Sequence, residues 1–134
     1  MTTCLLDTNI LSAIIRKETR VEKYFREAIA NDTGLLLSLV VFYEIKRGLL
    51  KRDAKKQLSA FEHLANQLAW CDVVPADWEQ AARWWAERLR AGKPIEDADL
   101  LIAAQAKRLR ATLITDNEKD FAGLPIEIEN WRRK

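Results

Sequence analysis

Two acidic residues mark the ends of apolar segments where ligands commonly bind. Asp7 comes directly after the apolar run at residues 4–6, and Asp116 follows a similar run at residues 112–114, after one intervening threonine. Short runs of this kind are typical of buried parallel strands, and ligands in open parallel sheets bind just beyond the carboxyl ends of the strands. If the two strands are neighbours, Asp7 and Asp116 lie side by side at one edge of the sheet.

Two further acids fall on apolar faces of predicted helices. At about 100° per residue, Glu44 shares its side of the helix with Val40 and Val41, and Asp99 shares its side with the apolar residues three, four and seven positions later. An acid on a buried face is unfavourable unless it is paired or binds a metal. Taken alone, Asp99 could instead be an acid favoured by the helix dipole, and Glu44 could be the buried partner of a basic residue.

The four acids together indicate a metal site. Carboxylates that converge on one edge repel each other, and we expect no Lys or Arg at this edge to neutralise them. Oxygen ligands of this type suit Mg²⁺ or Mn²⁺ rather than zinc, and the only histidine, His63, lies in the middle of a predicted helix, where it is structural or exposed. A metal held by carboxylates suits phosphoryl transfer, because the ion activates a water and stabilises charge on the phosphate oxygens.

Strand-like and helix-like segments alternate along the chain, and this order predicts how the acids are positioned. Such alternation favours an α/β fold with a central parallel sheet of four to five strands and helices on both faces, in one domain covering residues 1–134. The tryptophans on the apolar stripes are expected in the core, including Trp78 and Trp85, whereas Trp84 falls off its stripe and could be exposed. The predicted strands are residues 4–6, 35–37, 70–74, 112–114 and 126–128, and the predicted helices follow Asp7, start at Thr19, cover 40–50, start at Asp53, start at Asp77 and cover 97–109.

The basic residues gather in three clusters, but a net charge of +2 is too small to indicate a nucleic-acid partner by itself. On charge alone the clusters are solvated helix faces and a tail, and a phosphate-binding surface stays open if the site chemistry supports it. The clusters consist of Lys46, Arg47, Lys51, Arg52, Lys55 and Lys56, then Lys107, Arg108 and Arg110, then Arg132, Arg133 and Lys134.

The cysteines and the hydropathy pattern indicate where the protein works. Cys4 and Cys71 lie in strand-like apolar runs and are expected to be buried thiols, in a reducing compartment. No apolar run approaches the roughly 18 residues of a membrane span, and the chain does not open with the pattern of an export signal. We therefore expect a cytoplasmic protein without a membrane partner.

In the four acids and the residues beside them, the chain resembles the PIN-domain family. Within that family it resembles the VapC-type toxins of bacterial and archaeal toxin–antitoxin pairs. The matching motifs occur in the family's order and cover essentially the whole chain. They are Leu-Asp-Thr-Asn at 6–9, Tyr-Glu-Ile-Lys-Arg-Gly at 43–48, Asp-Leu-Leu-Ile-Ala-Ala at 99–104, and Thr-Asp-Asn at 115–117 with Asp120 and Phe121 following. Many relatives carry a second Ser or Thr after the second strand, where this chain has Leu39 after Ser38, so the helix cap before Glu44 differs from the family's.

The resemblance implies a Mg²⁺- or Mn²⁺-dependent endoribonuclease. Its catalytic and metal-binding acids would be Asp7, Glu44, Asp99 and Asp116, with supporting polar residues Asn9, Thr115 and Asn117. Asp97 falls roughly opposite Asp99 on its helix and is expected to face solvent, whereas Glu96 lies nearer to the side of Asp99 but just before the helix.

The resemblance also implies partners. The substrate would be RNA, and the chain would form a homodimer that places two acidic sites along one groove. A cognate VapB-type antitoxin would silence it, covering helices near the site and often inserting an arginine. On this chain that surface would involve Leu11, Ile14, Ile15 and Phe42.

Other readings of the first acid fit less well. Phosphatases of the haloacid dehalogenase type normally require Asp-x-Asp, whereas Asn9 occupies the third position here. Receiver domains require paired acids after the first strand and a lysine after the last strand, and the sequence shows neither. A binding module that has lost its activity is disfavoured because all four acids are present. A PIN-domain nuclease outside any toxin–antitoxin pair is the remaining alternative interpretation.

Overall fold

Short apolar segments build one parallel sheet in the computed structural model, which describes residues 2–134. The strand order is β3-β2-β1-β4-β5, and every pairing is parallel. The strands are β1 (Thr3–Leu6), β2 (Gly34–Ser38), β3 (Ala69–Cys71), β4 (Thr112–Ile114) and β5 (Ile128–Glu129). The expected sheet of four to five parallel strands is confirmed.

The central strand β1 joins the two halves of the sheet. Its Leu5 pairs in register with Leu36 of β2, and its Leu6 pairs with Ile114 of β4. Both leucines of β1 are fully buried, since helices cover the two faces of the sheet. The first and fourth strands are therefore neighbours, as the placement of Asp7 beside Asp116 requires.

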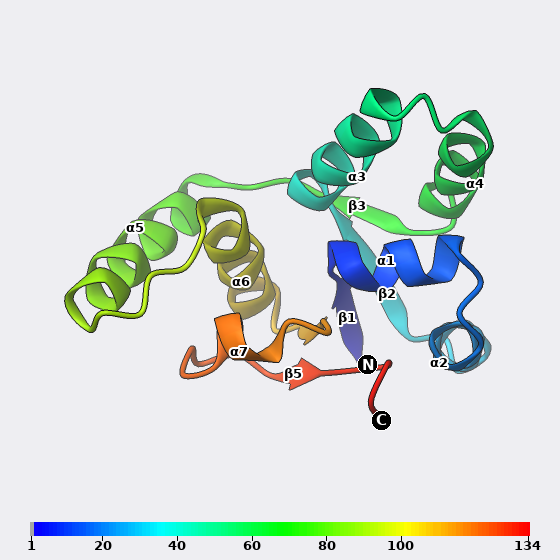
Figure 1. Cartoon of the computed structure of the whole chain (residues 1–134). Helices are drawn as coiled ribbons and strands as arrows, with labels where there is room; N and C mark the ends of the chain where they lie inside the picture. The colour runs from blue at the N-terminus through cyan, green and yellow to red at the C-terminus, as the bar shows by residue number, and fades with distance from the viewer. Residues whose placement is uncertain (1) are drawn as a thin grey trace.

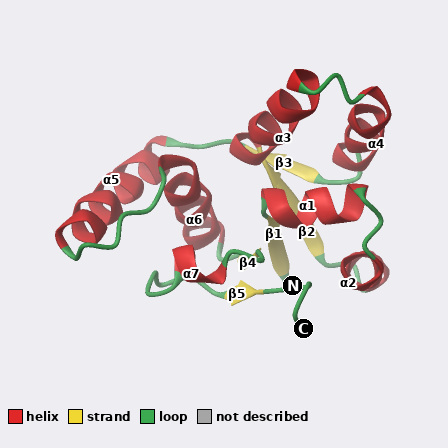
Figure 2. Ribbon diagram, in the orientation of Figure 1, coloured by secondary structure: helices red, strands yellow, loops and turns green. Residues whose placement is uncertain are grey.

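Seven helices connect the strands within the described residues. Figure 1 shows α5 and α6 together at the left and α3 and α4 at the upper right, and each pair is in contact. Figure 2 shows the extended connection that carries the chain from β3 across to α5. The helices are α1 (Thr8–Ile15), α2 (Thr19–Ala30), α3 (Leu39–Lys51), α4 (Lys55–Ala65), α5 (Pro75–Arg90), α6 (Asp97–Leu109) and α7 (Glu118–Phe121).

Ser38 starts helix α3 and fixes it to α6. Its hydroxyl oxygen accepts a hydrogen bond from the backbone N–H of Val40 at 3.1 Å, and the same hydroxyl donates to Oε1 of Gln105 at 2.5 Å. Ser38 and Gln105 are both fully buried. One serine thus supplies the cap, and Leu39 simply becomes the first residue of the helix that carries Glu44.

Helix α5 begins at Pro75 rather than at Asp77, and the tryptophan that it buries is not the expected one. Asp77 lies inside the first turn, where its carboxylate accepts the Val74 N–H at 3.0 Å and pairs with Arg108 of α6 at 2.9 Å. Asp77 and Trp84 lie on the same buried face of α5, and Trp84 is only 5% exposed.

The expected positions of the α5 tryptophans are therefore wrong. Trp78 and Trp85 are 59% and 48% exposed, whereas the sequence pattern placed both in the core and left Trp84 outside. The stripe of large apolar residues and the buried face of the helix are different surfaces, because the buried face is the one that carries Asp77, Ala81 and Trp84.

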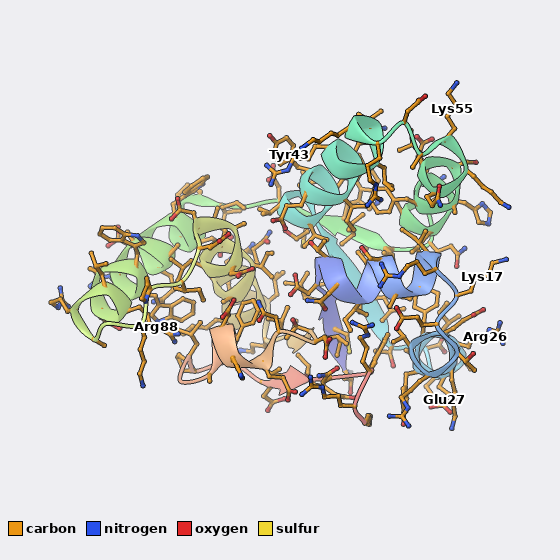
Figure 3. All side chains as sticks on the ribbon, viewed as in Figure 1. Lys17, Arg26, Glu27, Tyr43, Lys55 and Arg88 are labelled. Atoms are coloured by element: carbon orange, nitrogen blue, oxygen red, sulfur yellow. The ribbon has the colours of Figure 1, made fainter. Side chains whose placement is uncertain are left out.

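Several basic side chains point away from the body of the molecule. Figure 3 shows Lys17, Arg26 and Lys55 directed outward from α1, α2 and α4 or the turns beside them. Lys55 belongs to a predicted basic cluster, and its outward direction fits a solvated helix face. None of the helices found in residues 2–134 is both long and apolar enough to cross a membrane.

Candidate active site

The carboxyl ends of β1 and β4 place Asp7 beside the loop that carries Asp116. The Asp7 N–H donates to the Ile114 carbonyl at 3.0 Å, and the Thr115 hydroxyl donates to Oδ2 of Asp7 at 2.7 Å. The Asn9 amide donates to the same Oδ2 at 3.4 Å, and its oxygen accepts the Asp116 N–H at 2.9 Å. Thr115 and Asn9 therefore hold the buried Asp7 carboxylate and join the two loops.

Burial and hydrogen bonding act in opposite directions on Asp7. Burial raises the pKa of its carboxyl group above the ordinary range, while hydrogen bonds from Thr115, Thr8 and Asn9 favour the charged form and lower it. The side chain is only 4% exposed. A carboxylate fixed in this way is available as a ligand in one orientation.

Glu44 is attached to the same loop from helix α3. The Thr8 hydroxyl donates to Oε1 of Glu44 at 3.0 Å, and both residues are half-buried. The sequence pattern predicts no role for Thr8, although this residue lies between Asp7 and Asn9 in the first motif. Its hydroxyl orients the second acid of the site.

Asp99 lies half-buried in the first turn of α6 and faces several other acids. Burial and, after it, the negative charges of Asp7, Glu44, Asp120 and Glu96 together raise the pKa of its carboxyl group to about 7. Three of the four predicted acids, Asp7, Glu44 and Asp99, therefore share one electrostatic environment.

Asp120 was missed as a site residue by the sequence analysis. Its charge acts on Asp99, and its Oδ2 accepts a hydrogen bond from the Asn117 amide at 2.7 Å. The backbone N–H of Asn117 in turn donates to the Thr115 hydroxyl at 3.0 Å. The signal was present in the motif, because Asp120 follows Asn117 by one helical turn and precedes a buried phenylalanine.

Asp116 has different surroundings from the other three acids. Its Oδ2 lies 3.0 Å from Nη1 of Arg132, and its Oδ1 accepts a hydrogen bond from the Asn130 amide at 2.9 Å and lies 3.6 Å from Nε of Arg133. The Asn130 hydrogen bond and, after it, the two arginines hold the pKa of Asp116 below its usual range. Asp116 is not among the charges that act on Asp99.

The expectation that no Lys or Arg reaches this edge is therefore wrong. Strand β5 lies parallel to β4, so residues 130–133 emerge at the same carboxyl edge as Asp116. From their charge alone, Arg132 and Arg133 are expected in a solvated tail. Their true position depends on the two-residue strand β5, and a strand this short cannot be placed from its own sequence pattern.

The donor atoms suit a hard divalent cation, but the acids do not form a closed cage. Carboxylate oxygens of Asp7, Glu44 and Asp99 with nearby hydroxyl oxygens are ligands that Mg²⁺ and Mn²⁺ prefer. Within residues 2–134, no three His, Cys, Asp or Glu side chains lie close enough together to hold a metal ion as a group. Mg²⁺ commonly uses one or two carboxylates together with waters, so an arrangement of this kind still fits the ion.

A groove of about 430 Å³ lies beside Glu44 and includes part of the expected partner surface. Ile15 lines it, and Ile14 and Phe42 are partly buried nearby on the same helices. Leu11 is fully buried in the core, so its assignment to a contact surface is wrong. The groove is lined by Thr8, Ser12, Ile15, Arg16, Glu44, Ile45, Gly48, Leu49, Arg52 and Gln57.

Comparisons with known proteins agree with this architecture. The PIN domain family matches residues 4–126. The chain is 30% identical to ribonuclease VapC2 from Rickettsia felis over 95% of this chain and 96% of that protein, and 30% identical to ribonuclease VapC19 from Mycobacterium tuberculosis over 90% and 94%. The fold is similar to a chain in the crystal structure of VapBC2 from Rickettsia felis bound to promoter DNA, with a TM-score of 0.86, 27% identity and coverage of 97% and 99%.

Proposed function

This chain belongs to the PIN domain family, and from this membership we propose that it is an endoribonuclease of the VapC type, with residues 1–134 forming a single domain. The observation that carries the proposal is that Thr8 donates hydrogen bonds to both Asp7 and Glu44, and that the charges of these two acids act on Asp99. Two relatives at 30% identity bear the name ribonuclease VapC, which supports the same reaction class.

The proposed site is built from the four acids. Asp7, Glu44, Asp99 and Asp116 would hold Mg²⁺ or Mn²⁺, which when bound supplies an activated water and stabilises charge on the phosphate. Thr115 and Asn9 orient Asp7, and Thr8 orients Glu44, so the carboxylates are in position before RNA arrives. Asn117 supports the site through Thr115 and Asp120.

The proposed partners follow from the same relationship. We propose RNA as the substrate, a VapB-type antitoxin as the inhibitor and a homodimer as the assembly, in the cytoplasm. The similarity to VapBC2 supports an antitoxin partner, and the groove beside Glu44 lies where a bound segment would reach the site. An adjacent gene for a small DNA-binding protein would support a toxin–antitoxin pair over a nuclease that acts alone.

The first experiment is cleavage of total cellular RNA by the purified protein with Mg²⁺ or Mn²⁺. We expect discrete cuts that EDTA prevents and that Asp99→Asn reduces by at least about a hundredfold, since removal of a group that acts in the transition state costs factors of this size. Asp97→Asn is the matched control, because Asp97 is an exposed acid two residues away on the same helix. It should cut at the wild-type rate.

Two results would contradict the proposal. Cleavage by Asp99→Asn at the wild-type rate would remove Asp99 from the site or reveal a contaminating nuclease. Absence of cleavage of any RNA, by folded protein free of antitoxin, would favour a binding role without catalysis.

A further inference from the structure

Arg132 is held between two carboxylates near the end of the chain. Its Nε lies 3.0 Å from Oε1 of Glu18, its Nη2 lies 3.3 Å from Oε2 of Glu18, and its Nη1 lies 3.0 Å from Oδ2 of Asp116. Its backbone N–H donates to Oδ1 of Asn130 at 3.0 Å, and its carbonyl accepts from Arg20 at 3.3 Å. These contacts fix the guanidinium in position.

The two oxygens of Asp116 have partners of different kinds. Oδ1 accepts a neutral amide N–H from Asn130, a buried residue that also donates to Glu118 at 3.0 Å, and Oδ1 lies 3.6 Å from Nε of Arg133. Oδ2 faces the charged guanidinium of Arg132. The Asn130 amide carries no charge, so the guanidinium of Arg132, which is closer than that of Arg133, is the main group that neutralises the carboxylate.

The other three proposed metal ligands have no such partner. Asp7 and Glu44 accept hydrogen bonds from the neutral groups described above, and none of the ion pairs found in residues 2–134 involves Asp7, Glu44 or Asp99. Of the four proposed ligands, Asp116 is the one that pairs with arginine side chains in the described part of the chain. To bind Asp116, a divalent cation would have to displace the guanidinium of Arg132 from its carboxylate.

We propose that Arg132 is a positioning residue that competes with the divalent cation for the Asp116 carboxylate, so that the Arg132–Asp116 pair and cation binding at Asp116 exclude one another. This inference rests on the proposed function. Glu18 keeps the guanidinium in place beside the site, so Asp116 can pair with it again when the cation leaves. The strength of this pair then sets how tightly the site holds its cation.

Mn²⁺ affinity measured by isothermal titration calorimetry tests the competition. Arg132→Gln removes the competing charge, so we expect Mn²⁺ to bind about two- to fivefold more tightly, which is the size of a partly exposed ion pair. Arg83→Gln is the matched control, because Arg83 pairs at 3.0 Å with Glu79, an exposed residue on the same helix α5. It should leave the affinity unchanged.

Two further variants separate the specific pair from a general effect of charge. Arg133→Gln removes the same charge one residue later, at a longer 3.6 Å contact, and should raise the affinity less. In an Asp116→Asn background, Arg132→Gln should no longer raise the affinity, because the two residues act through one contact. An equal gain in Arg133→Gln, or a gain that persists without Asp116, would overturn the inference.

A spectroscopic measurement follows the arginine itself. Binding that excludes the pair must act in both directions, so Mg²⁺ should shift the NMR signal of the Arg132 guanidinium in the wild type and should not shift it in Asp116→Asn. Wild-type protein that binds cations without this shift, or an Arg132→Gln variant with unchanged affinity, would overturn the inference alone. Wild-type protein that neither binds cations nor cuts RNA would overturn the proposed function as well.

Discussion

The Asp99 carboxyl group is half-buried at the start of α6 and faces other carboxylates. These surroundings raise its pKa from an ordinary value of 3.8 to about 7, with burial the largest cause. The folded protein therefore favours the protonated form. The contribution of Asp99 to stability is fully present below about pH 4 and is lost as the pH rises to about 7.

We predict that Asp99→Asn, which carries no charge, is more stable than the wild type at pH 8 when EDTA is present. The difference should be on the order of 2 kcal/mol at pH 8 and should decrease toward pH 4. Thermal melts across this pH range measure it. Asp97→Asn should show no such pH dependence, and an Asp99→Asn difference that grows toward low pH would contradict the assigned environment.

Ser38 is the residue that joins a helix cap to the buried interior. We predict that Ser38→Ala destabilises the fold by about 2 kcal/mol, because it removes the cap of α3 and leaves the buried Gln105 oxygen without a donor. Denaturant unfolding measures the change. Ser59→Ala, at an exposed position in α4, should change the stability by less than about 0.5 kcal/mol; equal effects of the two substitutions would contradict this role.

At the scale of elements, the rotation of α5 is decided by its contact with α6. Asp77 pairs with Arg108, and Lys107 lies 5.6 Å from the centre of the Trp84 ring. Arg88 extends the contact to α7, where its Nη1 donates to the Ala122 carbonyl at 2.8 Å. These contacts bury one face of a helix whose largest apolar side chains lie partly on another.

The neighbouring tryptophans of α5 provide a direct test of this rotation. We predict that Trp84→Ala lowers the free energy of unfolding by about 3–5 kcal/mol, because the side chain is buried. Trp85→Ala should change it by less than about 1 kcal/mol, since Trp85 is largely exposed. Urea unfolding of the two variants compares them, and a larger loss in Trp85→Ala would contradict the burial of the face that carries Trp84.

At the scale of the whole molecule, the carboxyl edge of the sheet gathers residues from distant parts of the chain. Asp7 follows the first strand, Glu44 comes from α3, Asp99 from α6 and Asp116 with Arg132 from the last part of the chain. The site therefore depends on the complete sheet, including the two-residue strand β5 that directs residues 130–133 to this edge.

The assembly is also a property of the whole molecule. The family resemblance predicts a homodimer, so light scattering of the purified protein should give twice the mass of the 134-residue chain. The mass should stay the same when Asp99→Asn is measured, since this variant removes a charge of the site and leaves the fold intact. A single-chain mass at every concentration would contradict the prediction.

The sequence by itself determined the fold class and the origin of the site residues. Apolar runs that end in polar residues marked the ends of β1 and β4, and helical periodicity placed α6 at its observed bounds, Asp97–Leu109. Local patterns carry this information because a buried strand and a helix each require a particular spacing of apolar residues. The charges of Asp7 and Glu44 act on Asp99, and the role of the four acids in a metal site stays a prediction.

Only the tertiary structure decided the surroundings of those acids. It brought Arg132 to Asp116 and Asp120 toward Asp99, and it buried Trp84 in place of Trp85. Each of these placements depends on a contact between segments that are distant in sequence or on the rotation of one helix against another. Local periodicity contains no information about such contacts, because the energy that selects them arises only when the elements pack together.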